Sequence, residues 1–473
     1  MKRLKTTIFY LIVIFNLFYA CKQNDQKSNS IEGIWKSVGY GKILKIDSTT
    51  YKYFDITSIS CLPSKQGDLS QLKKSMLLTN DTLAVKRGYS VYYYTRANEL
   101  FDLCNQKSAK ANNPLYNFEV FADTYKEHYA YFGLNNINWD SLYSTSRKKI
   151  NSNTTEVELY LIIQKMIDSL KDNHGYIEPT ERVYELAENQ NNVNEKAEQQ
   201  KEYGDFEIAG LVAEHYLKEN LTKDSWLVKW GKMEDDIGYI QINAMWLYAD
   251  LNLSDSLVKE NGFVSTYVSE FDKLNYTEQV EMEVKGISSI MDKVMNDLIE
   301  TKFIIIDVRF NGGGQDEVGL EVLRRFNTDR RQIASKKAKH KNGFTKKTPI
   351  YLEPAKKPYT KPIYLLTSPQ SASATDMMAL SSMELKQLKR IGSHTNGAIS
   401  DALEKTLPNG WYLSLSNEVY TDNNDKHYEN IGIPVDFELN YHEDRQTFFR
   451  GVAEDLEKDK MNILKAIEKL QTE

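Results

Sequence analysis

Cysteine and histidine are scarce in this chain, with three cysteines and seven histidines among 473 residues. The cysteines stand alone at positions 21, 61 and 104, and none has the short spacing of a structural zinc site. The histidines are scattered through the sequence as well. We therefore expect no metal centre, and no motif in the sequence calls for a cofactor.

An excess of positive charge is also absent. Lysine and arginine total 60 residues against 66 of aspartate and glutamate, which gives a formal net charge of -6 and a pI near 5.8. Proteins that bind nucleic acid usually carry a basic surface, so nucleic acid is not an expected partner. The densest basic run, residues 336–341, is predicted to be a solvated loop.

Long apolar runs are missing except near the N-terminus, where residues 8–19 are largely apolar and follow three basic residues. This block is too short for a comfortable membrane span and is typical of an export signal. It ends at Ala20 and Cys21, the arrangement of a bacterial lipoprotein signal. We expect residues 1–20 to be removed, Cys21 to be lipidated, and residues 21–30 to be a linker, which makes the protein an exported bacterial lipoprotein, either periplasmic or anchored to the outer membrane. Plain secretion is the alternative.

Export would expose the other two cysteines, Cys61 and Cys104, to oxidising conditions. A disulfide between them and a pair of buried free thiols look identical in sequence. Both possibilities stay open.

The periodicity of apolar residues changes several times along the chain. Short aromatic-rich alternating stretches come first, helical periodicity follows, and a run rich in charge, Gln and Asn is predicted to be a mobile surface segment. Alternating strands and helices then indicate an α/β core, in which residues 302–310 are predicted to be a strand buried on both faces. The predicted regions are a small β-domain (31–105), a helical segment (106–186), a charged insertion (187–230), the α/β core (231–441) and a C-terminal helix (442–473).

Three consecutive glycines, Gly312, Gly313 and Gly314, follow the buried strand directly. Such a turn can take positive φ angles and present several amide N–H groups to a ligand. The lysine and hydroxyl of a phosphate-binding P-loop are missing, and the spacing does not fit a dinucleotide fingerprint. An oxyanion hole is the better interpretation, although a plain tight turn would give the same pattern.

The stretch "TSPQSASATDMMA" lies where another buried strand gives way to a helix. Ser373 and Asp376 have the spacing of a helix capping box, which is the purely structural interpretation. A serine at a helix N-terminus also meets unpaired amides and the positive end of the helix dipole, so it could serve as a nucleophile. The second interpretation needs a general base.

Among the histidines, His174 is the best candidate for that base. It follows a predicted amphipathic helix and lies in the turn Asn-His-Gly, so it is held firmly and stays accessible. His128 and His215 fall within helical patterns, whereas His340 and His442 lie among charged residues. His394 and His427 remain possible from sequence alone.

Five motifs occur in order along the chain: "LKDNHGYI", "IIIDVRFNGGG", "LLTSPQSASATDMMA", "LPNGWYLSLS" and "YENIGIPVD". Together they resemble the tricorn-core branch of the C-terminal processing peptidase family, over about residues 113–440. The resemblance implies a serine peptidase on a crotonase-like (ClpP/crotonase-type) α/β core.

The resemblance also implies roles for individual residues. Ser373 matches the nucleophile, three residues before the acidic Asp376. The processing branch pairs its serine with a lysine after a Gly-rich turn, but Ala398 occupies that position here. The tricorn-like branch uses a histidine in a D-x-H motif, matched by His174, and a glutamate that corresponds to Glu429.

The tricorn tetrad has a serine before its histidine, whereas this chain has Asn173. No PDZ-like segment is apparent between His174 and Ile237, so we expect the walls of the cleft to select the substrate, with the N-terminal β-domain among them. The resemblance assigns the oxyanion hole to the amides of Gly312, Gly313, Gly314 and Ala374.

The leading hypothesis is therefore an exported, lipid-anchored serine peptidase that hydrolyses peptides or unfolded proteins. The alternative is a non-catalytic protein that binds hydrophobic ligands or peptides on the same core. Crotonase-type acyl-thioester chemistry is a third hypothesis, but an exported protein has no evident supply of coenzyme A.

Overall fold

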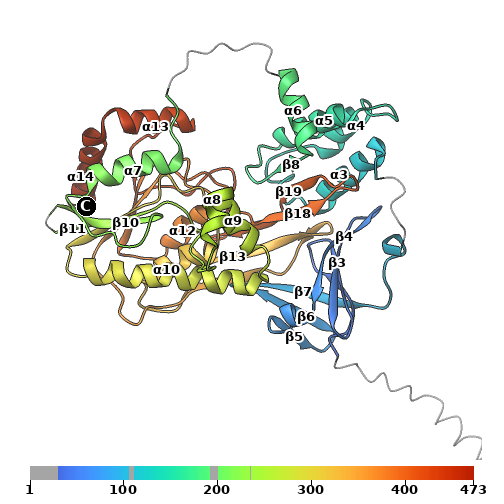
Figure 1. Cartoon of the computed structure of the whole chain (residues 1–473), viewed down its shortest axis with the longest axis horizontal. Coiled ribbons are helices and arrows are strands. Elements are labelled where there is room, and N and C mark those ends of the chain that lie inside the picture. Colours follow the sequence, from blue (N-terminus) through green and yellow to red (C-terminus); the bar gives the residue numbers. More distant parts are fainter. Residues whose placement is uncertain (1–29, 106–110, 192–200, 235, 473) are drawn as a thin grey trace, which may run out of the picture.

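A computed structural model of the chain describes residues 30–105, 111–191, 201–234 and 236–472 (Figure 1). The predicted signal peptide, residues 1–20, and the predicted lipidation site, Cys21, lie outside the described residues. Among the described residues, no helix combines the length and apolar character needed to cross a membrane.

The β-domain predicted near the N-terminus is an antiparallel sheet of seven strands in the order β4-β3-β2-β1-β7-β6-β5. Inward-facing residues such as Leu44 and Leu83 are fully buried. A disulfide joins Cys61 on β4 to Cys104, which follows the sheet. The elements are β1 (Gly33–Ser37), β2 (Lys42–Ile46), β3 (Thr50–Ile56), β4 (Cys61–Asp68), α2 (Ser70–Lys73), β5 (Met76–Thr79), β6 (Thr82–Arg87), β7 (Ser90–Ala97) and η1 (Asp102–Asn105).

A group of helices packs beside this sheet and shares a core with three strands, β18-β19-β8. Thr155 begins α5 with a capping box, in which its hydroxyl and the Glu158 carboxylate bond each other's backbone N–H groups. The chain turns after α5 and enters β8, so the predicted His174 motif lies in that turn. The elements are α3 (Pro114–His128), α4 (Trp139–Arg147), α5 (Glu156–Asp168), β8 (Tyr176–Glu178), α6 (Glu181–Asn191), β18 (Ala402–Thr406) and β19 (Tyr412–Ser416).

The core is a second seven-stranded sheet, in the order β21-β17-β16-β12-β11-β10-β9, whose strands from β11 to β21 run parallel. β12 is buried on both faces as predicted: Ile304 and Ile306 pack toward α10–α12, and Ile305 packs toward α7, α13 and α14. The strands are β9 (Glu219–Asn220), β10 (Val228–Glu234), β11 (Ile237–Ile242), β12 (Phe303–Asp307), β16 (Ile363–Thr367), β17 (Leu388–Gly392) and β21 (Phe437–Glu438); the helices are α7 (Asp205–Tyr216), α8 (Asp255–Asn261), α9 (Phe263–Phe271), α10 (Tyr276–Leu298), α11 (Asp316–Arg324), α12 (Ala374–Ser382), α13 (Arg445–Glu454) and α14 (Leu456–Thr472).

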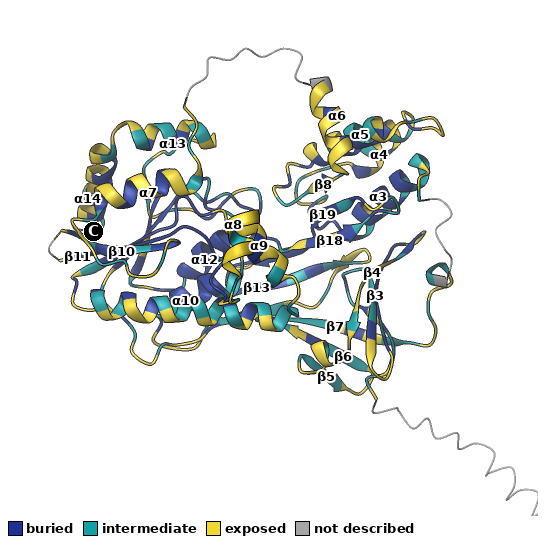
Figure 2. Cartoon of the chain, viewed as in Figure 1, coloured by how far each residue is buried: buried dark blue, intermediate teal, exposed yellow. Residues whose placement is uncertain are grey.

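Helix α7 belongs to this core, although it lies inside the range expected as a charged insertion. Its Ile208, Ala209 and Val212 are fully buried against the sheet. Part of the charged run itself, residues 192–200, lies outside the described residues. Figure 2 shows the sheet interior as buried and the outer faces of the surrounding helices as partly exposed.

The basic run 336–341 is not the solvated loop that the sequence suggested. Most of it is strand β13, and Lys336 is buried with its Nζ 3.0 Å from Glu418 Oε2 on the neighbouring strand β20. The opposite charge compensates for burying the lysine, and a partner 82 positions away leaves no local trace in the sequence. This sheet contains β13 (Arg331–His340), β14 (Gly343–Phe344), β15 (Thr348–Leu352) and β20 (Glu418–Thr421).

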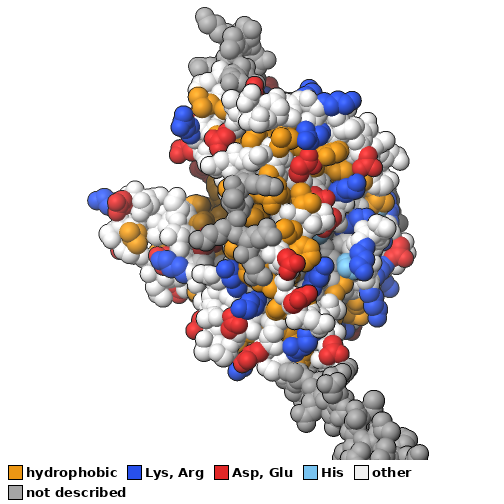
Figure 3. Space-filling model, turned by 90° about the vertical axis from the view of Figure 1, so that its right-hand side faces the viewer, with side chains coloured by type: hydrophobic (Ala, Val, Ile, Leu, Met, Phe, Trp, Pro, Cys, Tyr) orange, Lys and Arg blue, Asp and Glu red, His pale blue; other side chains and the backbone are white. Residues whose placement is uncertain are grey.

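Charged side chains of both signs lie on one face of the molecule. Figure 3 views the side formed by the N-terminal sheet and the helices beside it, and both signs of charge are interspersed over that face. The view shows no broad basic surface of the kind that nucleic-acid binding would need.

Candidate active site

Ser373 lies at the first turn of α12, just after the parallel strand β16. Its backbone has φ 57° and ψ −119°, a conformation that residues other than glycine rarely adopt and that is common at functional sites. The other serines of the same stretch hold the backbone instead. The Ser368 hydroxyl donates to Arg309 O at 2.6 Å, and the Ser371 hydroxyl donates to Val308 O at 2.8 Å.

Asp376 fixes the position of the Ser373 backbone. Its carboxylate accepts the N–H groups of Ser373 (2.8 Å), Gly397 (2.8 Å) and Ala398 (3.1 Å). Complete burial raises the pKa of Asp376 to about 6, and the bonds from these donors limit the rise. Asp376 therefore joins the start of α12 to the turn that carries Ala398.

The glycine turn lies directly against Ser373. A Cβ added to Gly313 would come within 2.7 Å of the Ser373 Cβ, so only glycine fits there. The Gly313 N–H is already bonded to Asn311 Oδ1 at 2.9 Å. Within the described part of the chain, the N–H groups of Gly312, Gly314 and Ala374 have no hydrogen-bond acceptor.

His174 lies in the turn between α5 and β8, and its backbone N–H bonds to Asp172 Oδ1 at 3.0 Å. Its ring Nδ1 is buried and has no hydrogen-bond partner among the residues described. The Asn173 side chain bonds to the core, with its Nδ2 2.6 Å from Asn396 Oδ1. The side chain that replaces the tetrad serine thus holds the turn against the core.

Two buried carboxyl groups beside this turn are joined by Ser416. Its hydroxyl lies 2.7 Å from Asp172 Oδ1 and 3.5 Å from Glu429 Oε1. Glu429 Oε2 accepts the N–H groups of Ile399 (3.0 Å) and Ser400 (2.8 Å). Burial and the nearby Asp172 raise the pKa of Glu429 well above its ordinary value.

Sequence reasoning missed Ser416 and gave Asp172 no role of its own. The D-x-H motif could have drawn attention to Asp172, because an aspartate two residues before a histidine can bond the histidine N–H. Ser416 ends a buried strand among other serines, and nothing in the sequence distinguishes it from Ser414.

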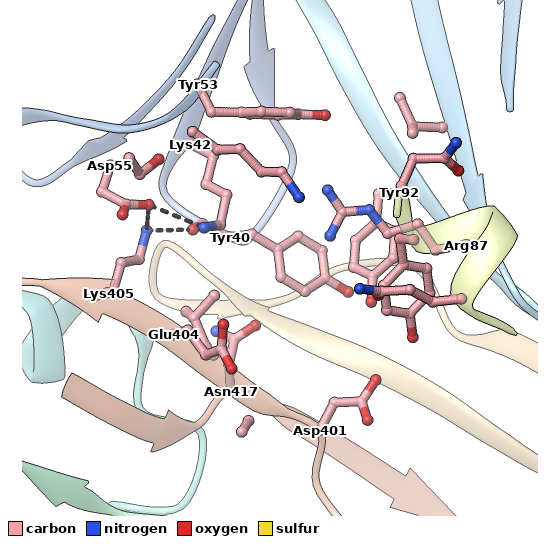
Figure 4. Close-up of a pocket in the computed structure, with 18 of the residues that line it drawn as sticks. Tyr40, Lys42, Tyr53, Asp55, Arg87, Tyr92, Asp401, Glu404, Lys405 and Asn417 are labelled. Atoms are coloured by element: carbon pink, nitrogen blue, oxygen red, sulfur yellow. Dashed lines mark hydrogen bonds and ion pairs between the residues drawn. The ribbon is translucent and has the colours of Figure 1, made fainter. Parts of the chain in front are cut away.

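Ser373 and His174 line the same cavity, which has a volume of about 730 Å³ and lies between the N-terminal sheet and the core. Lys405 closes one side: its Nζ bonds to Tyr40 O (2.8 Å), Gly41 O (2.7 Å) and Asp55 Oδ1 (3.1 Å). Figure 4 shows Tyr40, Lys42, Tyr53, Asp55, Arg87 and Tyr92 from the N-terminal sheet and its loops facing Asp401, Glu404, Lys405 and Asn417 from β18 and the segments that flank β18 and β19.

Two family models match the regions of the chain around this site. Residues 236–439 match peptidase family S41, and residues 111–168 match the tricorn protease C1 domain. The first range contains the glycine turn, Ser373 and Glu429, and the second ends just before His174. The chain belongs to peptidase family S41.

This S41 peptidase is a hydrolase of the serine type, is tricorn-like, and acts on peptides or proteins, so the predicted family is confirmed. Its fold is similar to that of a provisionally named peptidase from Parabacteroides merdae, with a TM-score of 0.52 and 22% identity over 70% of this chain and 90% of the other. A mutant of CPAF has a TM-score of 0.50 and 11% identity over 75% and 97%. The comparison with curated proteins found no match.

Proposed function

We propose that this S41 peptidase cleaves peptide bonds with Ser373 as nucleophile and His174 as general base. The observation that carries the proposal is that Ser373 and His174 border one cavity. Ser373 has the positive φ of an exposed nucleophile, and unpaired amides lie beside it. His174 can take a proton because its ring makes no competing bond in the described residues.

The proposed reaction has two stages. Ser373 Oγ bonds to the scissile carbonyl carbon as His174 removes the hydroxyl proton, and His174 then gives that proton to the leaving amine as the C–N bond breaks. Water, deprotonated by His174, next attacks the acyl ester and restores the serine.

The oxyanion formed in each stage needs N–H donors. The Gly313 amide, one of the four predicted donors, is occupied by Asn311. We therefore assign the role to Ala374 together with Gly312 or Gly314, whose amides are unpaired in the described residues. Losing one such donor typically costs about 3 to 4 kcal/mol in the transition state.

Glu429 is proposed to act through Ser416 and Asp172 rather than by direct contact with substrate. The two carboxyl groups and the hydroxyl between them hold the turn that carries His174, because Asp172 also accepts the His174 N–H. A negative charge on Asp172 would in addition stabilise the imidazolium that forms during the reaction.

A lysine base is the main mechanistic alternative, because Lys405 lines the same cavity and burial lowers its pKa to about 8. All three of its N–H donors are already directed at Tyr40, Gly41 and Asp55. Lys405 therefore has no N–H donor left for Ser373. The lysine that the processing branch uses is also missing, because Ala398 occupies its position.

Labelling with a serine-reactive phosphonate, followed by peptide mapping, tests the proposal. We expect modification of Ser373 alone and matching loss of peptide cleavage. Modification of another serine, or cleavage that persists without any labelling, would overturn the assignment. A protein that binds peptides but neither cleaves them nor reacts would instead favour the non-catalytic alternative.

We further propose a crotonase-like core, export, and a lipid anchor on Cys21, with the region limits predicted above. The support is the strand and helix alternation of the core and the basic, apolar and Ala-Cys sequence of residues 1–21. Growth with labelled palmitate should label the wild type and leave Cys21→Ser unlabelled; an unlabelled wild type would show plain secretion.

A further inference from the structure

The cavity that contains Ser373 has a second wall, formed by the N-terminal sheet. Strand β6 ends at Arg87, and Figure 4 shows its guanidinium group pointing into the middle of the residues drawn. Family membership assigns no task to this sheet, and the proposed reaction makes no use of Arg87.

Arg87 is surrounded by aromatic rings. Its guanidinium carbon lies 6.0 Å from the ring centre of Tyr53, 5.3 Å from that of Tyr92 and 5.6 Å from that of Tyr276. Such contacts favour a cation and limit its movement. Contacts of this kind need not use the in-plane N–H donors of the guanidinium group.

Within the described residues Arg87 makes no ion pair with a carboxylate, and its side chain hydrogen-bonds to Tyr53. Neighbouring cations differ in this respect: Lys42 and Lys405 both lie near Asp55, at 3.0 and 3.1 Å. Arg87 borders the cavity, and one hydrogen bond to Tyr53 uses only part of its five N–H donors. A fixed cation with spare donors and no carboxylate partner of its own is suited to bind a carboxylate.

We propose that Arg87 binds a carboxylate group of the peptide whose backbone lies at Ser373, and so sets the substrate preference of the peptidase. The inference rests on the proposed function, since it places the substrate in the same cavity. Planar guanidinium and carboxylate groups form two parallel hydrogen bonds, and the surrounding tyrosine rings reduce competition from water. The carboxylate belongs either to the C-terminus of the peptide or to an Asp or Glu side chain.

A binding measurement with the Ser373→Ala protein tests this without relying on catalysis. Three labelled peptides share one neutral sequence: one has a free C-terminal carboxylate, one a C-terminal amide, and one an amide plus an internal glutamate. We expect the first or the third to bind about tenfold more tightly than the neutral amide, as charge-assisted hydrogen bonds allow. The peptide that gains affinity identifies the source of the carboxylate.

Arg87→Gln in the same protein should remove that difference and leave the affinity for the neutral amide unchanged. Lys86→Gln is the matched control, because Lys86 is adjacent, exposed, borders the same cavity and carries the same charge. Equal binding of all three peptides, equal weakening of all three by Arg87→Gln, or the same loss in Lys86→Gln would overturn the proposal. Arg87→Lys, which keeps the charge, should retain part of the preference.

Cleavage assays on the protein with Ser373 intact distinguish the carboxylate-site proposal from the peptidase proposal. In the active protein, Arg87→Gln should raise KM for the preferred peptide about tenfold with little change in kcat. A protein that labels at Ser373 and cleaves all three peptides equally would refute the carboxylate site and leave the peptidase assignment intact. A protein that discriminates between the peptides but does not label would support the carboxylate site and refute the peptidase mechanism.

Discussion

Tyr89 of the N-terminal sheet donates its hydroxyl hydrogen to Asp316 Oδ2, with 2.5 Å between the oxygens. Asp316 begins α11, two positions after Gly314, and its neighbour Glu317 accepts the Tyr89 N–H at 3.0 Å. The turn between β6 and β7 is thus fixed to the residues that follow the glycine turn. The N-terminal sheet supports the geometry at Ser373 from outside the core.

Tyr89→Phe should therefore impair catalysis more than substrate binding. Loss of the hydrogen bond leaves the half-buried Asp316 carboxyl unpaired on that side, which typically costs about 1 kcal/mol of stability. We expect a lower kcat with a similar KM, because movement of the glycine turn affects the oxyanion donors. Tyr93→Phe, in an exposed position on β7, is the control and should match the wild type; equal kinetics in both variants would contradict the role of Tyr89.

Ser373→Ala and His174→Ala should each reduce kcat/KM by at least about a thousandfold, as loss of a nucleophile or general base does elsewhere. Thermal unfolding should stay close to the wild type, because neither side chain donates or accepts a hydrogen bond that holds the fold in the described residues. Ser371→Ala is the informative comparison: it loses the bond to Val308 O, so it should be less stable yet keep measurable activity. Activity above about a tenth of wild type in Ser373→Ala would refute the nucleophile.

Ser416→Ala should lower kcat by about tenfold or more, since it separates Glu429 from Asp172 and loosens the His174 turn. The activity profile against pH should also change, because the two carboxyl groups no longer share a hydroxyl. Ser414→Ala provides a close control on the same strand. The Ser414 hydroxyl is buried without a partner in the described residues, so its removal should be neutral or slightly stabilising.

Asp376 gives a prediction about stability and pH. Its pKa is raised to about 6 in the folded chain, whereas an unfolded aspartate titrates near 3.9. The folded state therefore holds the proton more tightly, and the contribution of Asp376 to stability is full below about pH 4 and declines as the pH rises to about 6. The decline is on the order of 3 kcal/mol.

Urea unfolding of the wild type and Asp376→Asn between pH 4 and 7 measures this contribution. The stability of the wild type relative to Asp376→Asn should fall across pH 4 to 6 and stay constant above that range. A difference that rises with pH would show that the carboxylate, rather than the carboxylic acid, is favoured in the folded chain.

The sequence predicted those parts of the protein that depend on local patterns. The strand 302–310 was recognisable because a run of isoleucines needs apolar layers on both faces, and the motif around Ser373 carries its own capping and turn residues. The family followed from the order of several such motifs. In each case the signal lies within a few residues of the feature.

The features that were missed depend on partners far apart in the chain. Lys336 looked solvated because Glu418 is 82 residues away, and Ser416 meets Asp172 across 244 residues. The occupied amide of Gly313 depends on the rotamer of Asn311, which sequence does not reveal. Buried polar groups are paired by tertiary folding, so their roles appear only when the sheets are assembled.

The pairing of β19 with β8 places His174 in a structure completed by strands more than two hundred residues further along the chain. A chain that ends between residues 383 and 400 would contain Ser373 and the glycine turn but would lack β19, Ser416 and Glu429, which hold the His174 turn. If His174 is the base, as proposed, peptide cleavage should begin only after the last third of the core has been synthesised.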